Sequence, residues 1–203
     1  MEQAVLFASE NLELEGMIER REGMRGVVVT HPHPLYGGDM DNMVVETICQ
    51  AYGQCGFTTL RFNFRGAGRS QGRYDEGRGE QNDVRAALGL LKDDGIQQID
   101  LAGYSFGAWI NAQAVTGGLQ TQRLVMVSPP VAFIDFADIG ALPDLQLVIT
   151  GSRDDIAPVK RIRQQLALWN PDSDLEIIDG CDHFYSGCTR QLKQTVIDHI
   201  ADG

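Results

Sequence analysis

Short apolar runs alternate with helical patterns along most of this chain, and this alternation limits the fold more than any other feature of the sequence. Two of the runs, Val-Val-Val from Val27 and Leu-Val-Met-Val from Leu124, contain no polar residue. Such runs are typical of parallel strands, because helices cover both faces of a parallel sheet. We therefore expect an α/β fold with a mostly parallel central sheet and helices on both faces. The strands are expected at 27–30, 57–64, 99–104, 124–128, 145–150 and 175–178, and the helices at 42–54, 80–91, 106–115, 159–168 and 189–200.

The N-terminal part predicts one more strand at residues 12–18, where the sequence alternates as Leu-Glu-Leu-Glu-Gly-Met-Ile. Alternation is typical of a strand with one exposed face, so we expect this strand to pair antiparallel at the edge of the sheet. The 203 residues contain no Pro/Gly/Ser-rich linker and no internal repeat. A chain of this length is expected to form one domain over residues 1–203.

Charge and composition exclude several classes of partner. The formal net charge of -11 at pH 7 repels phosphate backbones and anionic lipid surfaces, so neither nucleic acid nor a membrane is an expected partner. No stretch approaches the roughly 18 apolar residues of a membrane span, and the N-terminal segment lacks the basic region of a secretion signal. The expected location is the cytoplasm. Cys181, His183 and Cys188 lack a fourth zinc ligand, so no metal is expected.

Residues 103–107 read Gly-Tyr-Ser-Phe-Gly, a G-x-S-x-G sequence that follows an expected strand and precedes an expected helix. In this context the serine lies on a sharp, strained turn that exposes its hydroxyl group. The two glycines prevent side chains from colliding with the neighbouring backbone. We therefore interpret Ser105 as a nucleophile at the positive end of the following helix.

A serine hydroxyl group needs a base to accept its proton, and histidine is the usual one. Of the four histidines, His183 alone lies after Ser105 in a loop that follows an expected strand. His199 lies on the last expected helix, which is typical of a surface residue, and His31 and His33 precede Ser105. Chain order therefore predicts His183 as the general base.

The imidazole ring in turn needs a carboxylate that fixes its tautomer and stabilises its charged form. Asp154 and Asp155 both follow the strand expected at 145–150, and their position alone leaves both open. One of the two is expected to serve only as a turn or N-cap residue. Other aspartates fit less well, namely Asp182, which adjoins His183, and Asp135 and Asp138, which follow the preceding strand.

Backbone N–H groups are the usual stabilisers of the oxyanion that forms during acyl transfer. Phe106, directly after Ser105, is expected to donate one of them. The second is expected from the loop that reads His-Pro-His-Pro-Leu-Tyr-Gly-Gly from His31. Proline has no N–H group, so His33 or Leu35 remains, and we favour the main chain of His33. No acidic ligand accompanies the two histidines, so this loop is not expected to bind a metal.

With these motifs in place, the chain resembles the α/β-hydrolase superfamily, and most closely small, capless bacterial hydrolases that carry HPHPLYGG and RFNFRGxGxSxG. The resemblance extends from Val27 to the last helix and implies an α/β-hydrolase fold with a Ser-His-Asp triad. In such proteins the acid is the aspartate of G-x-x-D-x-x-V-P, which is Asp154 here, although Ala157 replaces the usual valine. A cap would follow the sixth strand, and the sixteen residues 129–144 are too few to form one.

Residues 63–70 look like the D-x-R-G-x-G-x-S motif of the same superfamily, with asparagine in the first position. The spacing is not that of a phosphate-binding loop. We expect a structural turn in which Arg65 pairs with Glu80 or Asp83 on the next helix. An open pocket is expected to have aromatic walls, and the candidates are Tyr36, Phe133, Phe136, Phe184 and Tyr185.

These residues predict a serine hydrolase that cleaves a carboxylic ester or a thioester through a covalent acyl-enzyme. Its partner would be a small-molecule acyl substrate, and the mechanism needs no cofactor. One alternative is a serine peptidase or amidase of the same fold. Another is a non-catalytic scaffold, since a fold does not fix a function, although the complete set of Ser105, Asp154 and His183 argues against it.

Overall fold

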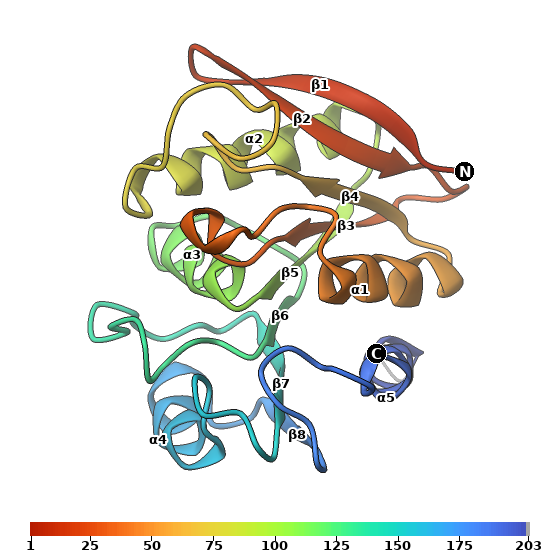
Figure 1. Cartoon of the computed structure of the whole chain (residues 1–203). Helices are drawn as coiled ribbons and strands as arrows, with labels where there is room; N and C mark the ends of the chain where they lie inside the picture. The colour runs from red at the N-terminus through yellow and green to blue at the C-terminus, as the bar shows by residue number, and fades with distance from the viewer. Residues whose placement is uncertain (202–203) are drawn as a thin grey trace.

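The computed structural model describes residues 1–201, in which a mixed eight-stranded sheet forms the centre of the molecule (Figure 1). The strand order is β1-β2-β4-β3-β5-β6-β7-β8. β2 is antiparallel to both β1 and β4, and all other neighbours are parallel. The elements are β1 (Gln3–Ser9), β2 (Leu12–Glu19), β3 (Arg25–Thr30), η1 (Pro34–Tyr36), α1 (Met43–Gln54), β4 (Thr58–Phe62), α2 (Arg78–Asp93), β5 (Gln98–Tyr104), α3 (Phe106–Thr116), β6 (Leu124–Val127), β7 (Leu145–Gly151), α4 (Val159–Trp169), β8 (Asp174–Ile178) and α5 (Thr189–Ala201).

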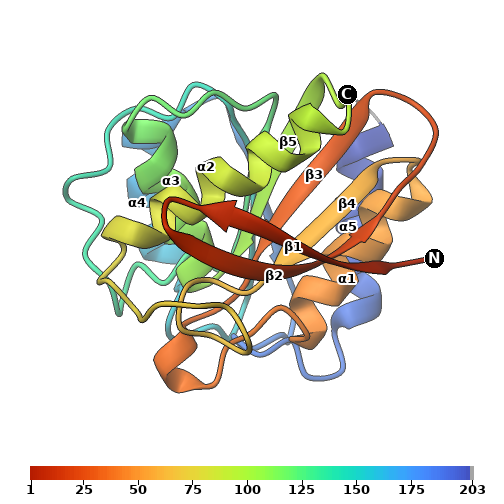
Figure 2. The ribbon, with the colours of Figure 1, turned by 90° about the horizontal axis from the view of Figure 1, so that it is seen from above.

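Helices cover both faces of the sheet, with α2, α3 and α4 on one face and α1 and α5 on the other (Figure 2). β3 shows why its apolar run is continuous. Val28 packs into the core beneath α2 and α3, whereas Val27 and Val29 pack into the core beneath α1 and α5. All three side chains are fully buried. Because successive side chains of a strand point to opposite faces, a strand covered on both sides needs an apolar residue at every position.

The N-terminal hairpin corrects one expectation. The strand expected at 12–18 is β2, and it pairs antiparallel, but it is not the edge strand. β1, which the sequence pattern does not predict, forms the edge and pairs with β2 from Gln3 to Ser9. Of its residues only Phe7 and Ser9 are buried. A strand with so little buried surface leaves only a weak pattern in the sequence.

The loops that follow the parallel strands gather at the carboxyl edge of the sheet, where ligand sites of this architecture lie. Thr30, at the end of β3, is paired with Gly103 of β5, so the loop after β3 begins beside the turn that carries Ser105. Residues 128–144, between β6 and β7, form turns and bends without a helix or strand, and they build no lid. None of the described helices is long and apolar enough to cross a membrane.

The loop after β4 is held against α2 by Arg65. Its Nε lies 3.0 Å from Oδ2 of the fully buried Asp83, and its Nη2 lies 2.8 Å from Oδ1 of the same residue. The same Nη2 donates to Glu10 at 2.9 Å. Glu80, the other expected partner, instead accepts the N–H group of Gly77 at 2.9 Å and caps the start of α2. Arg65 therefore fixes a turn, and its partner is Asp83.

Candidate active site

Ser105 lies on the turn between β5 and α3, and its backbone is strained. Its φ of 53° and ψ of -117° lie outside the regions that residues with side chains normally adopt. The flanking glycines make this turn possible. A Cβ atom at Gly103 would lie 2.6 Å from the backbone nitrogen of Ala108, and one at Gly107 would lie 2.6 Å from the carbonyl oxygen of Thr30. Only glycine fits both positions, and the turn presents Ser105 at the amino end of α3.

Ser105, His183 and Asp154 form a hydrogen-bonded chain that joins three loops. Ser105 Oγ lies 2.9 Å from His183 Nε2, and His183 Nδ1 lies 2.9 Å and 3.0 Å from the two carboxylate oxygens of Asp154. A carboxylate only accepts hydrogen bonds, so Nδ1 carries the ring proton and Nε2 is able to accept the proton of Ser105. The three residues are 8%, 7% and 3% exposed, respectively. The sequence predicts Ser105 as nucleophile and His183 as base, and the family resemblance implies Asp154 as the acid.

Asp154 is a buried carboxylate that is stabilised in its charged form. Burial alone would raise the pKa of Asp154, but hydrogen bonds from His183 and from the backbone of Ala157 hold it below its ordinary value. Its Oδ1 accepts the N–H groups of Ile156 at 2.9 Å and Ala157 at 2.7 Å. The neighbouring Asp155 is exposed, and it is Asp154 that meets His183.

The loop that carries Asp154 and the loop that carries His183 are in direct backbone contact. Gly151, at the end of β7, packs so closely against Cys181 that a Cβ atom there would collide with the Cys181 carbonyl oxygen. The N–H group of Arg153 donates to the same carbonyl group at 2.9 Å. These contacts set the separation of the two loops, and they explain why glycine opens the G-x-x-D segment.

Two tyrosines hold the loop that carries His183. The hydroxyl group of Tyr104 donates to the carbonyl oxygen of His183 at 2.8 Å, and the hydroxyl group of Tyr185 lies 2.9 Å from that of Ser128. Sequence reasoning finds neither role. Tyr104 occupies a variable position of G-x-S-x-G, and the partner of Tyr185 lies in a distant loop, so the pattern of the sequence contains no signal for either contact.

The loop after β3 lies against the start of α3. Phe106 is the first residue of α3, and the first N–H groups of a helix have no partner within the helix. The N–H group of Leu35 donates to Nδ1 of His33 at 3.2 Å, whereas no acceptor in residues 1–201 takes the main-chain N–H group of His33. The His33 ring packs on the rings of Phe106 and Tyr36, with centroids 4.6 Å and 4.9 Å away. Of the two candidate donors in this loop, Leu35 is therefore already engaged.

His31 ties this loop to the end of β4, a role that sequence reasoning does not assign. Its Nε2 accepts the N–H group of Phe64 at 3.0 Å, and its Nδ1–H donates to the carbonyl oxygen of Pro32 at 2.6 Å. The side chain is fully buried, and burial lowers the pKa of His31 to about 4. The ring is therefore neutral at pH 7, as the acceptor role of Nε2 requires. The only sequence signal is its position directly after a buried strand.

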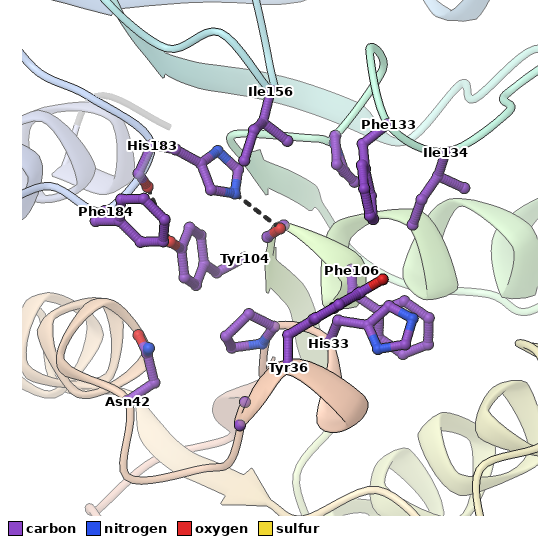
Figure 3. A pocket seen from close by; sticks show the side chains of 15 residues that line it. His33, Tyr36, Asn42, Tyr104, Phe106, Phe133, Ile134, Ile156, His183 and Phe184 are labelled. Atoms are coloured by element: carbon purple, nitrogen blue, oxygen red, sulfur yellow. Dashed lines mark hydrogen bonds between the residues drawn. The ribbon is translucent and has the colours of Figure 1, made fainter.

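Ser105 and His183 line a cavity of about 440 Å³, and Figure 3 shows the side chains around it. Two of the five aromatic walls expected from the sequence are wrong. Phe136 is 3% exposed and packs on Trp169 with ring centroids 5.2 Å apart, and Tyr185 is fully buried beside Ser128. Both rings are buried because each has a partner inside the protein, Trp169 for Phe136 and Ser128 for Tyr185. The other three expected residues line the cavity and are more than half exposed, namely Tyr36, Phe133 and Phe184.

Cysteines and metal ligands play no visible part in this arrangement. Within residues 1–201, no three His, Cys, Asp or Glu side chains are grouped so that they could hold a metal ion. All four cysteines are free thiols. Cys181 lies in the loop of His183, but burial raises the pKa of its thiol, so it is not a thiolate at neutral pH.

The chain is similar over most of its length to other bacterial proteins, although no family model matches it. An uncharacterized protein of Rickettsia prowazekii is 36% identical over 183 residues, which are 85% of this chain and 77% of that protein. An α/β serine hydrolase homologue from Coxiella burnetii is 34% identical with a TM-score of 0.90, over 98% of this chain and 97% of that one. An α/β serine hydrolase without a lid from Xanthomonas campestris is 28% identical with a TM-score of 0.90, over 99% of this chain and 94% of that one. The chain therefore belongs to the α/β-hydrolase superfamily, among the small lidless bacterial serine hydrolase homologues.

Proposed function

We propose that this protein cleaves a carboxylic ester or a thioester through a covalent acyl-enzyme, with Ser105 as nucleophile, His183 as general base and Asp154 as the acid that orients it. The observation that carries the proposal is the continuous hydrogen-bonded chain from Ser105 Oγ through the imidazole ring to the Asp154 carboxylate. The strained turn at Ser105 and the adjoining cavity add support. Side chains arranged in this way activate a serine hydroxyl group for attack on a carbonyl carbon.

In the first half of the reaction, His183 Nε2 accepts the hydroxyl proton while Ser105 Oγ bonds to the carbonyl carbon of the substrate. The backbone N–H groups of Phe106 and His33 donate to the oxyanion that forms. Asp154 stabilises the imidazolium. The ring then gives its proton to the departing alcohol or thiol, and the acyl group remains on Ser105.

Water completes the cycle. His183 accepts a proton from a water molecule that attacks the acyl carbon, and it returns this proton to Ser105 Oγ as the carboxylic acid leaves. No cofactor takes part in these steps. The open site suits a small-molecule acyl substrate, and the four free thiols fit a reducing compartment, so we propose that the enzyme acts in the cytoplasm.

Two other functions fit the fold less well. A peptidase or amidase would use the same three residues, but it also has to hold an extended amide backbone. The cavity offers it one amide side chain, Asn42, among mostly apolar walls. A non-catalytic scaffold would not need a strained serine aligned with a buried histidine and aspartate.

Labelling with a fluorophosphonate tests the nucleophile, because the reagent bonds only to an activated serine. We expect a single label, and peptide mapping should locate it on Ser105. Ser105→Ala should abolish the label. Ser186→Ala, which changes an exposed serine in the loop between β8 and α5, should keep it. A label on another serine of an active preparation would contradict the assignment.

A panel of p-nitrophenyl esters, acyl thioesters and aminoacyl amides tests the reaction class. We expect turnover of esters and thioesters, with a burst of the first product when deacylation is the slower half. Faster turnover of the amides would favour the peptidase. A well-folded protein that neither reacts with the fluorophosphonate nor cleaves any member of the panel would be a scaffold.

A further inference from the structure

The walls of the cavity beside Ser105 contain no lysine, arginine, aspartate or glutamate. Fifteen residues line it, and none of them is Lys, Arg, Asp or Glu. Apart from Ser105, His183 and His33, the walls consist of aromatic, isoleucine, proline and glycine residues and a single amide, Asn42. Pockets of this kind bind mainly through apolar contact and use a few polar groups to orient the ligand.

The charge directly behind the His183 ring is negative. Asp154 lies directly behind His183 and is ionised. Burial, together with the charges of Asp154 and Asp182, raises the pKa of Tyr104, which lines the cavity. The whole chain carries a net charge of -11. A carboxylate that entered would lose its water without meeting a Lys or Arg side chain among the lining residues, and that loss is costly.

Apolar side chains lie on both sides of the reacting residues (Figure 3). Phe133 and Ile134 lie on one side of the His183 ring, and Phe184 lies on the other. Tyr36 and Phe133 have their ring centroids 5.8 Å apart, and both rings are more than half exposed. Exposed aromatic faces beside a cavity favour flat or bulky apolar groups.

We infer that the substrates are electrically neutral esters or thioesters with an apolar acyl or alcohol group, and that the site rejects acyl groups with a carboxylate as well as coenzyme A thioesters. This inference rests on the proposed function, since it concerns the substrates of the same serine. It follows from three observations, which are the uncharged walls, the negative charges behind them and the exposed aromatic rims.

Two matched pairs of substrates test the inference. p-Nitrophenyl hexanoate and p-nitrophenyl hydrogen adipate share a leaving group and a six-carbon acyl chain, but only the adipate has a carboxylate. Butyryl-N-acetylcysteamine and butyryl-coenzyme A share the acyl group and the thioester, but only the second carries phosphates. We expect kcat/KM to be about 100-fold lower for the adipate and about tenfold lower for the coenzyme A thioester. A high salt concentration should leave the ratio of kcat/KM between the adipate and the hexanoate unchanged, because buried charges are screened little.

A substitution at the rim tests the electrostatic cause. Phe133→Arg places a cation beside the cavity at a position that is 60% exposed, where the fold should accept it. It should raise the ratio of kcat/KM for the adipate over the hexanoate by roughly fivefold, the size of an exposed ion pair. Phe133→Gln, the matched control, removes the same ring without adding a charge. Any rise of this ratio that comes from loss of the ring alone should therefore be clearly smaller in Phe133→Gln than the rise in Phe133→Arg.

The outcomes separate the two proposals. A wild-type enzyme that cleaves both members of each pair at similar rates would overturn the inference while leaving the serine hydrolase intact. An unchanged ratio in Phe133→Arg would also overturn it, because charge would not then be the cause. No turnover of any of the four substrates and no label on Ser105 would instead refute the proposed function, and the inference with it.

Discussion

Replacing His31 with asparagine tests how the loop that carries His33 is held in place. The amide nitrogen of asparagine lies close to the position of Nδ1 and should keep the hydrogen bond to Pro32. It has no atom at the position of Nε2, so the N–H group of Phe64 loses its acceptor. A buried donor without a partner costs about 1–3 kcal/mol, and the smaller side chain leaves a cavity as well. We expect the free energy of unfolding at pH 7 to fall by about 2–4 kcal/mol.

The pH dependence of this loss gives the sharper test. The pKa of His31 is about 4 in the folded protein and 6.5 when unperturbed, so the unfolded chain binds the proton more strongly. The contribution of His31 to stability is therefore complete above pH 6.5 and is lost as the pH falls through 4. The full difference is worth about 3 kcal/mol, of which about 2 kcal/mol is lost between pH 7 and pH 4.5. Because the His31→Asn variant has no such group, the advantage of the wild type over it should shrink by about 2 kcal/mol.

Urea unfolding followed by circular dichroism at both pH values measures this advantage. The carboxylates titrate in the same range in both proteins, so only the difference between wild type and variant is used. An advantage of equal size at both pH values would refute the neutral, buried state of His31. A variant that is less stable but keeps the wild-type kcat would show that His31 stabilises the fold without positioning the loop that carries His33.

Three further changes have definite expected outcomes. Asp154→Asn should lower kcat on p-nitrophenyl hexanoate by about 10⁴-fold, whereas Asp155→Asn should change kcat by less than about twofold. Circular dichroism checks that both variants are folded. A large loss in Asp155→Asn and not in Asp154→Asn would show that the acid is assigned one residue too early. Arg65→Ala leaves its partner on α2 buried without a cation and should lower the free energy of unfolding by about 3–5 kcal/mol in urea. A stable variant with a raised KM would instead place that arginine at the substrate. Gly151→Ala should force the loops of Asp154 and His183 apart and lower kcat by more than about tenfold. Gly140→Ala is the control, because a Cβ atom there meets open space, and its kcat should match that of the wild type.

The order of strands and helices could be predicted because burial on both faces leaves a trace in the sequence. Val27, Val28 and Val29 are apolar in succession, since each packs into one of two cores. β1 shows no such apolar pattern, because it pairs with one strand only and has only two buried residues. Its place at the edge is decided by hydrogen bonds to β2, and backbone pairing of that kind is open to almost any sequence.

Those residues of the site could be predicted that a local sequence pattern or the order of residues along the chain identifies. A strained turn demands glycines at fixed spacing, so Ser105 is visible in one short segment. The roles of His31, Phe136 and Tyr185 depend on partners that lie elsewhere in the chain, and a single ring or imidazole carries no sign of them. Likewise, position alone does not separate Asp154 from its neighbour, because the backbone N–H groups that hold its carboxylate belong to the folded loop.

Ser105, Asp154 and His183 follow strands that differ in how deeply they are buried in the sheet. Ser105 follows the central strand β5, whose residues are buried from Ile99 onward, whereas the loop of His183 follows β8 at the edge, where Ile178 alone is buried. Local opening is easiest where little surface is buried, so the β8 corner should open long before the centre of the sheet. Mild heating should then abolish the proposed activity by displacing His183 while the turn of Ser105 stays folded, and cooling should restore the activity. Amide hydrogen exchange would record this as early loss of protection in β8 and late loss in β5.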